Sequence, residues 1–201
     1  MLIMQCPSAS SRRSYIESQN LGRVIFSYDH GEVECVQYHP KTVPGGVISE
    51  CDSHGGGERQ GGLEKRMGRW HACGTDWKRY SGIMERRTRL GFRGVVCRLD
   101  EGESDTEHAA RRWEEVFVDS RKGNTIQFWG GVELEFLAGE KGKREGIEII
   151  KLDVDGKQRL DELLERAGKE GLKRVSENSI EMLGIIWVFL LRGQNETRSR
   201  L

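Results

Sequence analysis

One unit occurs twice in the C-terminal half of this chain, and each copy is predicted to run strand, helix, strand, strand. The first copy opens with the apolar segment 92–99 and continues into a helix that carries Trp113 near its end. The second copy opens with segment 147–154 and continues into a helix over 160–167. Each copy has an apolar helix face and apolar strands, which it must bury against the other copy. The duplication therefore predicts an α+β fold for this half of the chain.

Local signals set the bounds of the elements inside each copy. A capping box over residues 104–107 predicts the start of the first helix. After this helix, 125–129 and 132–137 are predicted strands, and the second of them alternates apolar and polar side chains as a half-buried strand does. Two further strands, around 179–182 and 185–191, close the second copy. We therefore expect a mixed or antiparallel sheet with both helices on one face.

The composition excludes several classes of function. The 201 residues carry 32 basic and 32 acidic side chains, so no net charge favours nucleic acid or an anionic membrane. Segment 185–191 is strongly apolar but far shorter than the ~20 residues that span a bilayer, which predicts a buried strand. The five cysteines are scattered without a C-x-x-C pair, a pattern typical of reduced thiols. We therefore expect a soluble, cytoplasmic protein with no nucleic-acid or membrane partner.

The chain divides into four predicted regions. Residues 1–22 are rich in Ser, Arg, Gln and Asn without an apolar period, and are expected to form a disordered leader. Residues 23–90 hold three short predicted strands and a Gly-rich insertion, which together indicate a loop-rich N-terminal module. Residues 91–192 form the duplicated domain, and 193–201 are expected to be a disordered tail.

The duplicated domain resembles the vicinal oxygen chelate superfamily, which includes glyoxalase I, bleomycin-resistance proteins and extradiol dioxygenases. The resemblance rests on the paired units, on Trp113 near the end of its helix, and on the strand 132–137 with the charged, Gly-containing turn 139–146 after it. Residues 23–54 resemble the tail of a preceding module whose opening strand and helix are missing. The resemblance implies an α+β fold of paired β-α-β-β(β) modules, with an incomplete N-terminal module.

The resemblance also implies where chemistry would occur. In this superfamily each module supplies half of an incomplete barrel, and the concave sheet surface encloses the ligand. Metal-dependent members take a His or Gln from the first strand of a module and a Glu from its last strand. On this pattern the first-strand positions fall near Gly94 and Ile149, and the last strand, 185–191, offers no carboxylate. We therefore assign no metal ligand to the duplicated domain, and expect a divalent metal only if another chain, as in a homodimer, completes the site.

The candidate catalytic residues lie in the N-terminal region. Glu50, Asp52 and His54 alternate along one predicted strand, and residues 30–34 repeat the pattern one strand earlier with His30, Glu32 and Glu34. Carboxylates and imidazoles that converge from adjacent strands suit a hard divalent ion or a general acid–base pair. A polar sheet end beside a loop would explain the same residues without any chemistry.

The candidate substrate-binding residues lie in the duplicated domain. Glu133 and Glu135 are two positions apart, so their carboxylates share one strand face. Trp129 and Trp187 could line a cavity for an aromatic or apolar ligand. Solvated carboxylates on a half-exposed strand and ordinary core packing of the two indoles are the alternative interpretations.

Three functional hypotheses follow. The first is a glyoxalase-like enzyme of lyase or dioxygenase type that acts on a small oxygenated metabolite. The second is a non-catalytic protein of the bleomycin-resistance kind, which would sequester an apolar or aromatic ligand. The third is an inactive, truncated homologue, which the missing opening strand and helix of the N-terminal module would explain.

Overall fold

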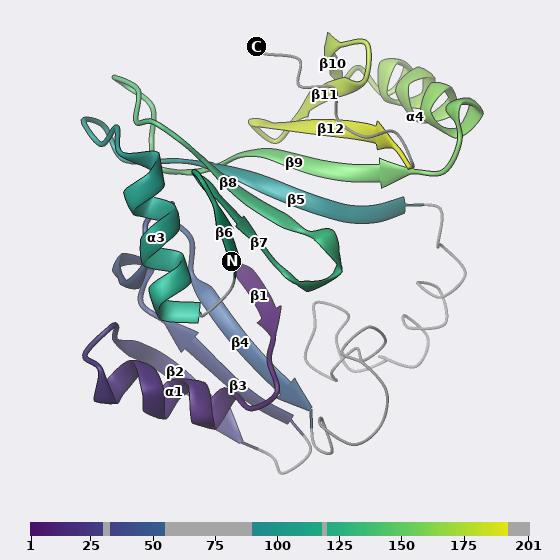
Figure 1. Ribbon diagram of the computed structural model, residues 1–201. Coiled ribbons are helices and arrows are strands. Elements are labelled where there is room, and N and C mark those ends of the chain that lie inside the picture. The colour runs from purple at the N-terminus through teal and green to yellow at the C-terminus, as the bar shows by residue number, and fades with distance from the viewer. Residues whose placement is uncertain (30–32, 55–89, 118–119, 193–201) are drawn as a thin grey trace.

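The computed structural model describes residues 1–29, 33–54, 90–117 and 120–192, and Figure 1 shows their arrangement. Within these residues the chain forms the sequence strand, helix, strand, strand, strand three times. The first module makes a four-stranded sheet, and the second and third share a sheet of eight strands. The fold is therefore α+β and built from β-α-β-β-β modules, as the resemblance implied.

The N-terminal module contains four strands and one helix, in the chain order β1 (Leu2–Gln5), α1 (Ala9–Ser18), β2 (Val24–Asp29), β3 (Val33–Tyr38) and β4 (Ser49–His54). A short 3-10 helix, η1 (Pro40–Thr42), lies between β3 and β4. The strand order is β1-β4-β3-β2, in which β1 is parallel to β4 and the other neighbours are antiparallel.

The prediction of a disordered leader over residues 1–22 is wrong, because β1 and α1 lie within it. Ser8 caps α1 by accepting a hydrogen bond from the Ser11 N–H, and Ala9 and Ile16 are buried against the sheet. Only these two side chains of α1 are buried, so the helix has almost no apolar period to detect. The opening strand and helix that the sequence interpretation found missing are thus β1 and α1.

The second and third modules confirm the duplicated domain and add one short strand to each copy. The second module runs β5 (Leu90–Arg98), α3 (Thr106–Phe117), β6 (Ser120–Lys122), β7 (Thr125–Gln127) and β8 (Glu133–Leu137), with the 3-10 helix η3 (Trp129–Gly131) before its last strand. The third runs β9 (Gly146–Val154), α4 (Lys157–Lys169), β10 (Lys173–Ser176), β11 (Ser179–Met182) and β12 (Ile185–Leu191). The unpredicted strands are β6 and β10.

The two modules join through their first strands, because β5 and β9 pair antiparallel at the centre of the eight-stranded sheet. Each first strand is parallel to the last strand of its own module, β8 or β12. Val95, Ile150 and Trp187 are register partners in one row and pack against the helix side, so α3 and α4 cover the same face. The other face carries Glu133 and Glu135, and we call it the open face because no described helix packs on it.

The helix α3 begins at Thr106, close to the predicted start, but Asp105 caps it. A carboxylate oxygen of Asp105 accepts a hydrogen bond of 2.9 Å from the His108 N–H. Helix α3 has a strongly apolar side, and its Ala109, Ala110, Trp113, Val116 and Phe117 are all buried. The predicted buried face of this helix is confirmed.

The N-terminal module packs on the second module through α3. Trp113 is fully buried, its indole N–H donates to the Pro44 carbonyl at 2.8 Å, and its ring lies 5.1 Å from that of Phe117. Tyr38, from β3, meets Phe117 edge to face at 5.8 Å. One apolar core therefore serves the first two modules, while a smaller core lies under α4. No helix in the described ranges is long and apolar enough to cross a membrane.

Candidate functional site

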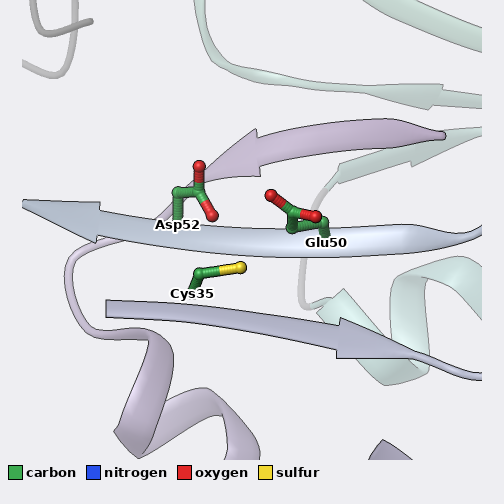
Figure 2. Close-up of side chains that lie close together, drawn as sticks. All are labelled: Cys35, Glu50 and Asp52. Atoms are coloured by element: carbon green, nitrogen blue, oxygen red, sulfur yellow. The ribbon is translucent and has the colours of Figure 1, made fainter. Parts of the chain in front are cut away.

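Three side chains that can ligate a metal gather on one face of the N-terminal sheet, as Figure 2 shows. Glu50 and Asp52 are two positions apart on β4, so both side chains project to the same side. Cys35 on β3 is the direct register partner of Asp52. The ligand atoms of the three residues all lie within 4.8 Å of one another. The strand register alone therefore creates a compact cluster of two carboxylates and one thiol.

The cluster lies on the face opposite α1. The alternate residues of β4, Cys51 and Ser53, face the helix: Cys51 belongs to the apolar core, and the Ser53 hydroxyl accepts a hydrogen bond from the Ala9 N–H. Despite this, Glu50 and Asp52 are only 6% and 4% exposed. Two buried carboxyl groups at this separation cannot both stay charged without a compensating positive charge or a proton.

The electrostatics of the cluster follow from that burial. Burial, and next the charge of Glu50, raise the pKa of Asp52 to about 7, whereas a hydrogen bond from Cys35 acts in the opposite direction. Burial and then the two carboxylates raise the pKa of the Cys35 thiol well above its ordinary value. The amide of Gln37 donates to Glu50 at 2.5 Å and orients that carboxylate. Neutral pH is thus close to the pKa of the Asp52 carboxyl, and a bound cation would favour its charged form.

The first strand of this module adds a residue that sequence reasoning missed. In the parallel pairing of β1 and β4, Ile3 lies beside Glu50 and Gln5 lies beside Asp52, so Gln5 shares the face of the cluster. A Gln on the first strand and an acidic residue on the last strand is the ligand pattern that the superfamily resemblance implies. The sequence pattern alone does not reveal it, because it predicts a disordered leader where β1 lies. The apolar start of the chain and the capping residue Ser8 are the signals that could have revealed it.

The donor set fits a divalent transition-metal ion. Two carboxylates supply hard oxygen ligands and the charge that such an ion needs, and a thiolate sulfur suits ions softer than Mg²⁺ or Ca²⁺. A bound cation would also reverse the local effect of the carboxylates on the thiol of Cys35 and favour its deprotonation. The residues present can therefore hold a metal, even though no metal ligand had been assigned from the sequence.

Of the other N-terminal candidates, Glu34 is the one whose side chain the structure describes. His54 is the last residue of β4 and the register partner of Val33, but its side chain lies outside the described residues, as do His30 and Glu32. Glu34 lies on the α1 face, where it accepts hydrogen bonds from the Ser10 N–H at 3.0 Å and the Ser53 hydroxyl at 2.9 Å. The expectation that Glu34 shares a face with the cluster is wrong, because the register of β3 and β4 brings Cys35 there instead.

The candidates of the duplicated domain do not join this cluster, because they belong to the eight-stranded sheet. Glu133 and Glu135 lie on its open face, and Glu135 forms an ion pair of 3.2 Å with Lys151 of β9. Trp187 lies on the opposite, helix-covered face, where its indole N–H donates to the Met182 carbonyl at 3.2 Å. Trp187 therefore packs in the core and does not line the face of the two glutamates. The side chain of Trp129 lies outside the described residues.

The first-strand positions of the duplicated domain have physical reasons to lack ligands. A Cβ atom on Gly94 would lie 2.3 Å from the Glu133 carbonyl oxygen, so the close approach of β5 and β8 requires glycine there. Ile149 is half-buried on the open face and is the register partner of Val96 and of Ile186. These three apolar residues form a strip across the centre of the sheet where a polar cluster would otherwise lie.

One surface hollow lies away from all of these residues. It has a volume of about 330 Å³ and is lined by residues 20–23, His39, Lys41 and Thr42, at the junction of α1 and η1. None of the candidate site residues borders it. We therefore take the cluster of Cys35, Glu50 and Asp52, and not this hollow, as the candidate site.

Similarity to known proteins is found in the backbone fold and not in the sequence. No family model and no curated protein matches the sequence. Among solved structures, the chain is similar to a catechol 2,3-dioxygenase with a TM-score of 0.49 and 11% identity, over 99% of this chain and 74% of that one. It is also similar to BphC, a halotolerant catechol dioxygenase, with a TM-score of 0.49 and 12% identity, over 94% of this chain and 66% of that one. A proposed dioxygenase from Bacillus subtilis has a TM-score of 0.45 and 14% identity, over 94% of this chain and 61% of that one. The topology of the modules themselves, β-α-β-β-β units paired through their first strands, is of the vicinal oxygen chelate type.

Proposed function

We propose that this chain is a divalent-metal-dependent enzyme of lyase or dioxygenase type that acts on a small oxygenated metabolite. The observation that carries the proposal is the buried cluster of Cys35, Glu50 and Asp52, with Gln5 beside it on the first strand of the same module. The module type supports the proposal, since the superfamily it resembles uses first-strand and last-strand residues for this purpose.

The chain's own residues would have distinct tasks at such a centre. Glu50 and Asp52 would neutralise and hold the ion, and Gln37 fixes the orientation of Glu50 through its hydrogen bond. Cys35 lies on the neighbouring strand and would provide the sulfur ligand. When bound, the ion would supply Lewis-acid polarisation of substrate oxygens. Because the pKa of Asp52 is about 7, protons would compete with the metal in the neutral range.

We further propose that a second copy of the chain completes the site. The second and third modules pair through β5 and β9, their first strands. In the described part of the N-terminal module, β1 pairs as a strand with β4 alone. Antiparallel pairing of β1 with β1 of a second copy would repeat the arrangement of β5 and β9 and bring two clusters to one sheet.

Metal stoichiometry tests the first proposal. The protein is stripped with a chelator, loaded with Mn²⁺, Fe²⁺, Co²⁺ or Zn²⁺, desalted and measured by inductively coupled plasma mass spectrometry. We expect stoichiometric retention of at least one of these ions, and its loss in Asp52→Asn. Glu133→Gln is the matched control, because it removes a carboxylate from the corresponding face of the last strand of the second module. Equal metal retention by both variants, or no retention by the unmodified chain, would reject the centre.

The homodimer has its own test. Size-exclusion chromatography with light scattering gives the mass of the stripped and of the loaded protein. We expect a dimer that the metal stabilises and that the chelator weakens. A monomer in both states would remove the proposed pairing while leaving the metal result to stand by itself.

A second candidate function is supported by the apolar strip on the eight-stranded sheet. Val96, Ile149 and Ile186 lie in one row on the open face, next to the ion pair of Glu135 and Lys151. Val96 is buried in this row, and Ile149 and Ile186 are half-buried. Such a surface suits a non-catalytic protein that binds an apolar or aromatic molecule. Thermal-shift screening with aromatic acids and phenols should then raise Tm in Asp52→Asn as much as in the unmodified chain. If neither metals nor these ligands bind, the inactive homologue is the hypothesis that is left.

A further inference from the structure

Two cysteines meet on the helix-covered face of the N-terminal sheet, at the end of β1. They are Cys6 and Cys51, and no role in the proposed metal centre falls to either. We propose that they form a redox-active dithiol, which a peroxide converts into a reversible intramolecular disulfide. This inference does not depend on the proposed function.

The strand register brings the two side chains together. Met4 is the parallel register partner of Cys51, and Cys6 lies two positions further along, so all three face the same side. The Cys6 N–H donates to the Asp52 carbonyl at 2.8 Å, which extends the pairing of β1 and β4 to this residue. Cys6 packs against the core cluster that contains Cys51, and the two thiols are within hydrogen-bonding contact.

The two thiols differ in solvent exposure, and this difference determines which of them is oxidised first. Cys51 is only 2% exposed, whereas Cys6 is half-buried at the end of its strand, just before α1 begins at Ala9. An oxidant from solution therefore reaches Cys6 first. Cys51, held in the middle of β4, is the resolving partner.

The chemistry balances with one equivalent of a peroxide. The Cys6 sulfur attacks one oxygen of hydrogen peroxide, the O–O bond breaks, and Cys6 becomes a sulfenic acid while one water leaves. The Cys51 sulfur then attacks the Cys6 sulfur and displaces the hydroxyl group, which departs as a second water with the thiol proton. Two thiols and one peroxide thus give one disulfide and two waters.

Differential alkylation with peptide mapping tests the proposal. The chelator-stripped, folded protein is treated with hydrogen peroxide, its remaining thiols are alkylated, and the digest is measured by mass spectrometry. We expect a cross-linked peptide that contains Cys6 and Cys51, with an intact mass lower by two hydrogens, and full recovery of both thiols after dithiothreitol. Cys35, which lies on the other face of the same sheet, serves as the internal reference, and its thiol should still be alkylated after peroxide treatment.

A variant separates the two steps. In Cys51→Ser the sulfenic acid on Cys6 has no partner, so dimedone should label Cys6 after peroxide treatment, while Cys6→Ser should show no dimedone label at that position. The proposal fails if both cysteines remain alkylatable after peroxide, if Cys6 pairs with a different cysteine, or if folded Cys51→Ser shows no dimedone adduct on Cys6.

Discussion

The N-terminal module and the second module share a topology, and even an acidic pattern, but they treat their carboxylates differently. The last strand of each carries two acidic residues two positions apart on its open face, Glu50 and Asp52 in one and Glu133 and Glu135 in the other. Glu135 pairs with Lys151, which the third module supplies from β9. Glu50 and Asp52 contact Gln37 and Cys35. In the second module a carboxylate is therefore paired with a lysine. In the N-terminal module the two carboxylates lie beside groups that can share a proton or a metal ion with them.

The strand that pairs with the first strand of a module determines which side chains surround the module's carboxylates. In the second module the first strand pairs with β9, whose side chains bring Lys151 and Ile149 to the open face. In the N-terminal module the first strand carries Gln5 beside Asp52, and its other edge pairs with no described strand. The third module thus supplies a lysine to Glu135 of the second, whereas Asp52 of the first module is buried beside Glu50.

The largest expected effect comes from the residue that joins the two modules. Trp113→Ala removes a fully buried indole and its hydrogen bond to Pro44, and should cost about 3–5 kcal/mol of unfolding free energy. Trp187→Ala, in the half-buried core under α4, should cost less. Urea denaturation followed by circular dichroism measures both. An equal cost would mean that the first two modules do not share one core.

The next effect is a pH dependence of stability that the buried Asp52 gives to the N-terminal module. The Asp52 carboxyl has an ordinary pKa of 3.8 when unfolded and about 7 when folded, so between these values the folded chain holds a proton that the unfolded chain has lost. The stability of the metal-free protein should therefore fall as pH rises from about 4 to about 7, by at most ~4 kcal/mol, and then level off.

Chemical denaturation at a series of pH values in the presence of a chelator measures this slope. Asp52→Asn should flatten it, and Glu133→Gln should leave it unchanged. A slope of the opposite sign, or one that persists in Asp52→Asn, would show that Asp52 is not the titrating group.

A smaller effect concerns the ion pair of the second module. Glu135 and Lys151 have side chains 33% and 16% exposed, so their interaction is partly shielded from solvent. A double-mutant cycle with Glu135→Gln and Lys151→Met should give a coupling energy of about 1 kcal/mol. The coupling should shrink in high salt. A coupling near zero would mean that this lysine does not neutralise the pair, and would weaken the contrast between the modules.

The smallest effect tests whether α1 is a true module helix. Ser8→Ala removes the hydrogen bond to the Ser11 N–H and should lower the unfolding free energy by about 0.5–1 kcal/mol. Asp105→Ala, which removes the cap of α3, is the matched change in the second module. Thermal unfolding of the two variants should give similar losses in Tm, whereas no loss for Ser8→Ala would favour the disordered leader that the sequence had suggested.

The sequence predicted the duplicated domain well because its elements carry strong periodic signals. Helix α3 has five buried apolar residues on one side, and β8 alternates buried and half-buried side chains along its length. The strand β10 escaped prediction because all four of its side chains are exposed. Helix α1 escaped because it buries only Ala9 and Ile16. Elements with little apolar surface are held by tertiary contacts, which a local pattern does not contain.

The candidate site was predicted in part, for a similar reason. The shared face of Glu50 and Asp52 follows from strand alternation and was expected. Cys35 was not, because whether Glu34 or Cys35 reaches that face depends on the register of β3 against β4, and a slip of one residue would exchange them. Gln5 required β1 to be recognised first. Strand pairing over long sequence distances thus decided which residues met.

The most direct test of the metal centre is the absorption spectrum of the Co²⁺-loaded protein. A thiolate bound to Co²⁺ gives an intense near-ultraviolet charge-transfer band, so the spectrum reports the Cys35 ligand itself. We predict that the band appears at stoichiometric Co²⁺, disappears in Cys35→Ser and in Asp52→Asn, and persists in Cys6→Ser and in Glu133→Gln. Absence of the band in the unmodified protein, or its survival in Cys35→Ser, would contradict a metal centre built from Cys35, Glu50 and Asp52.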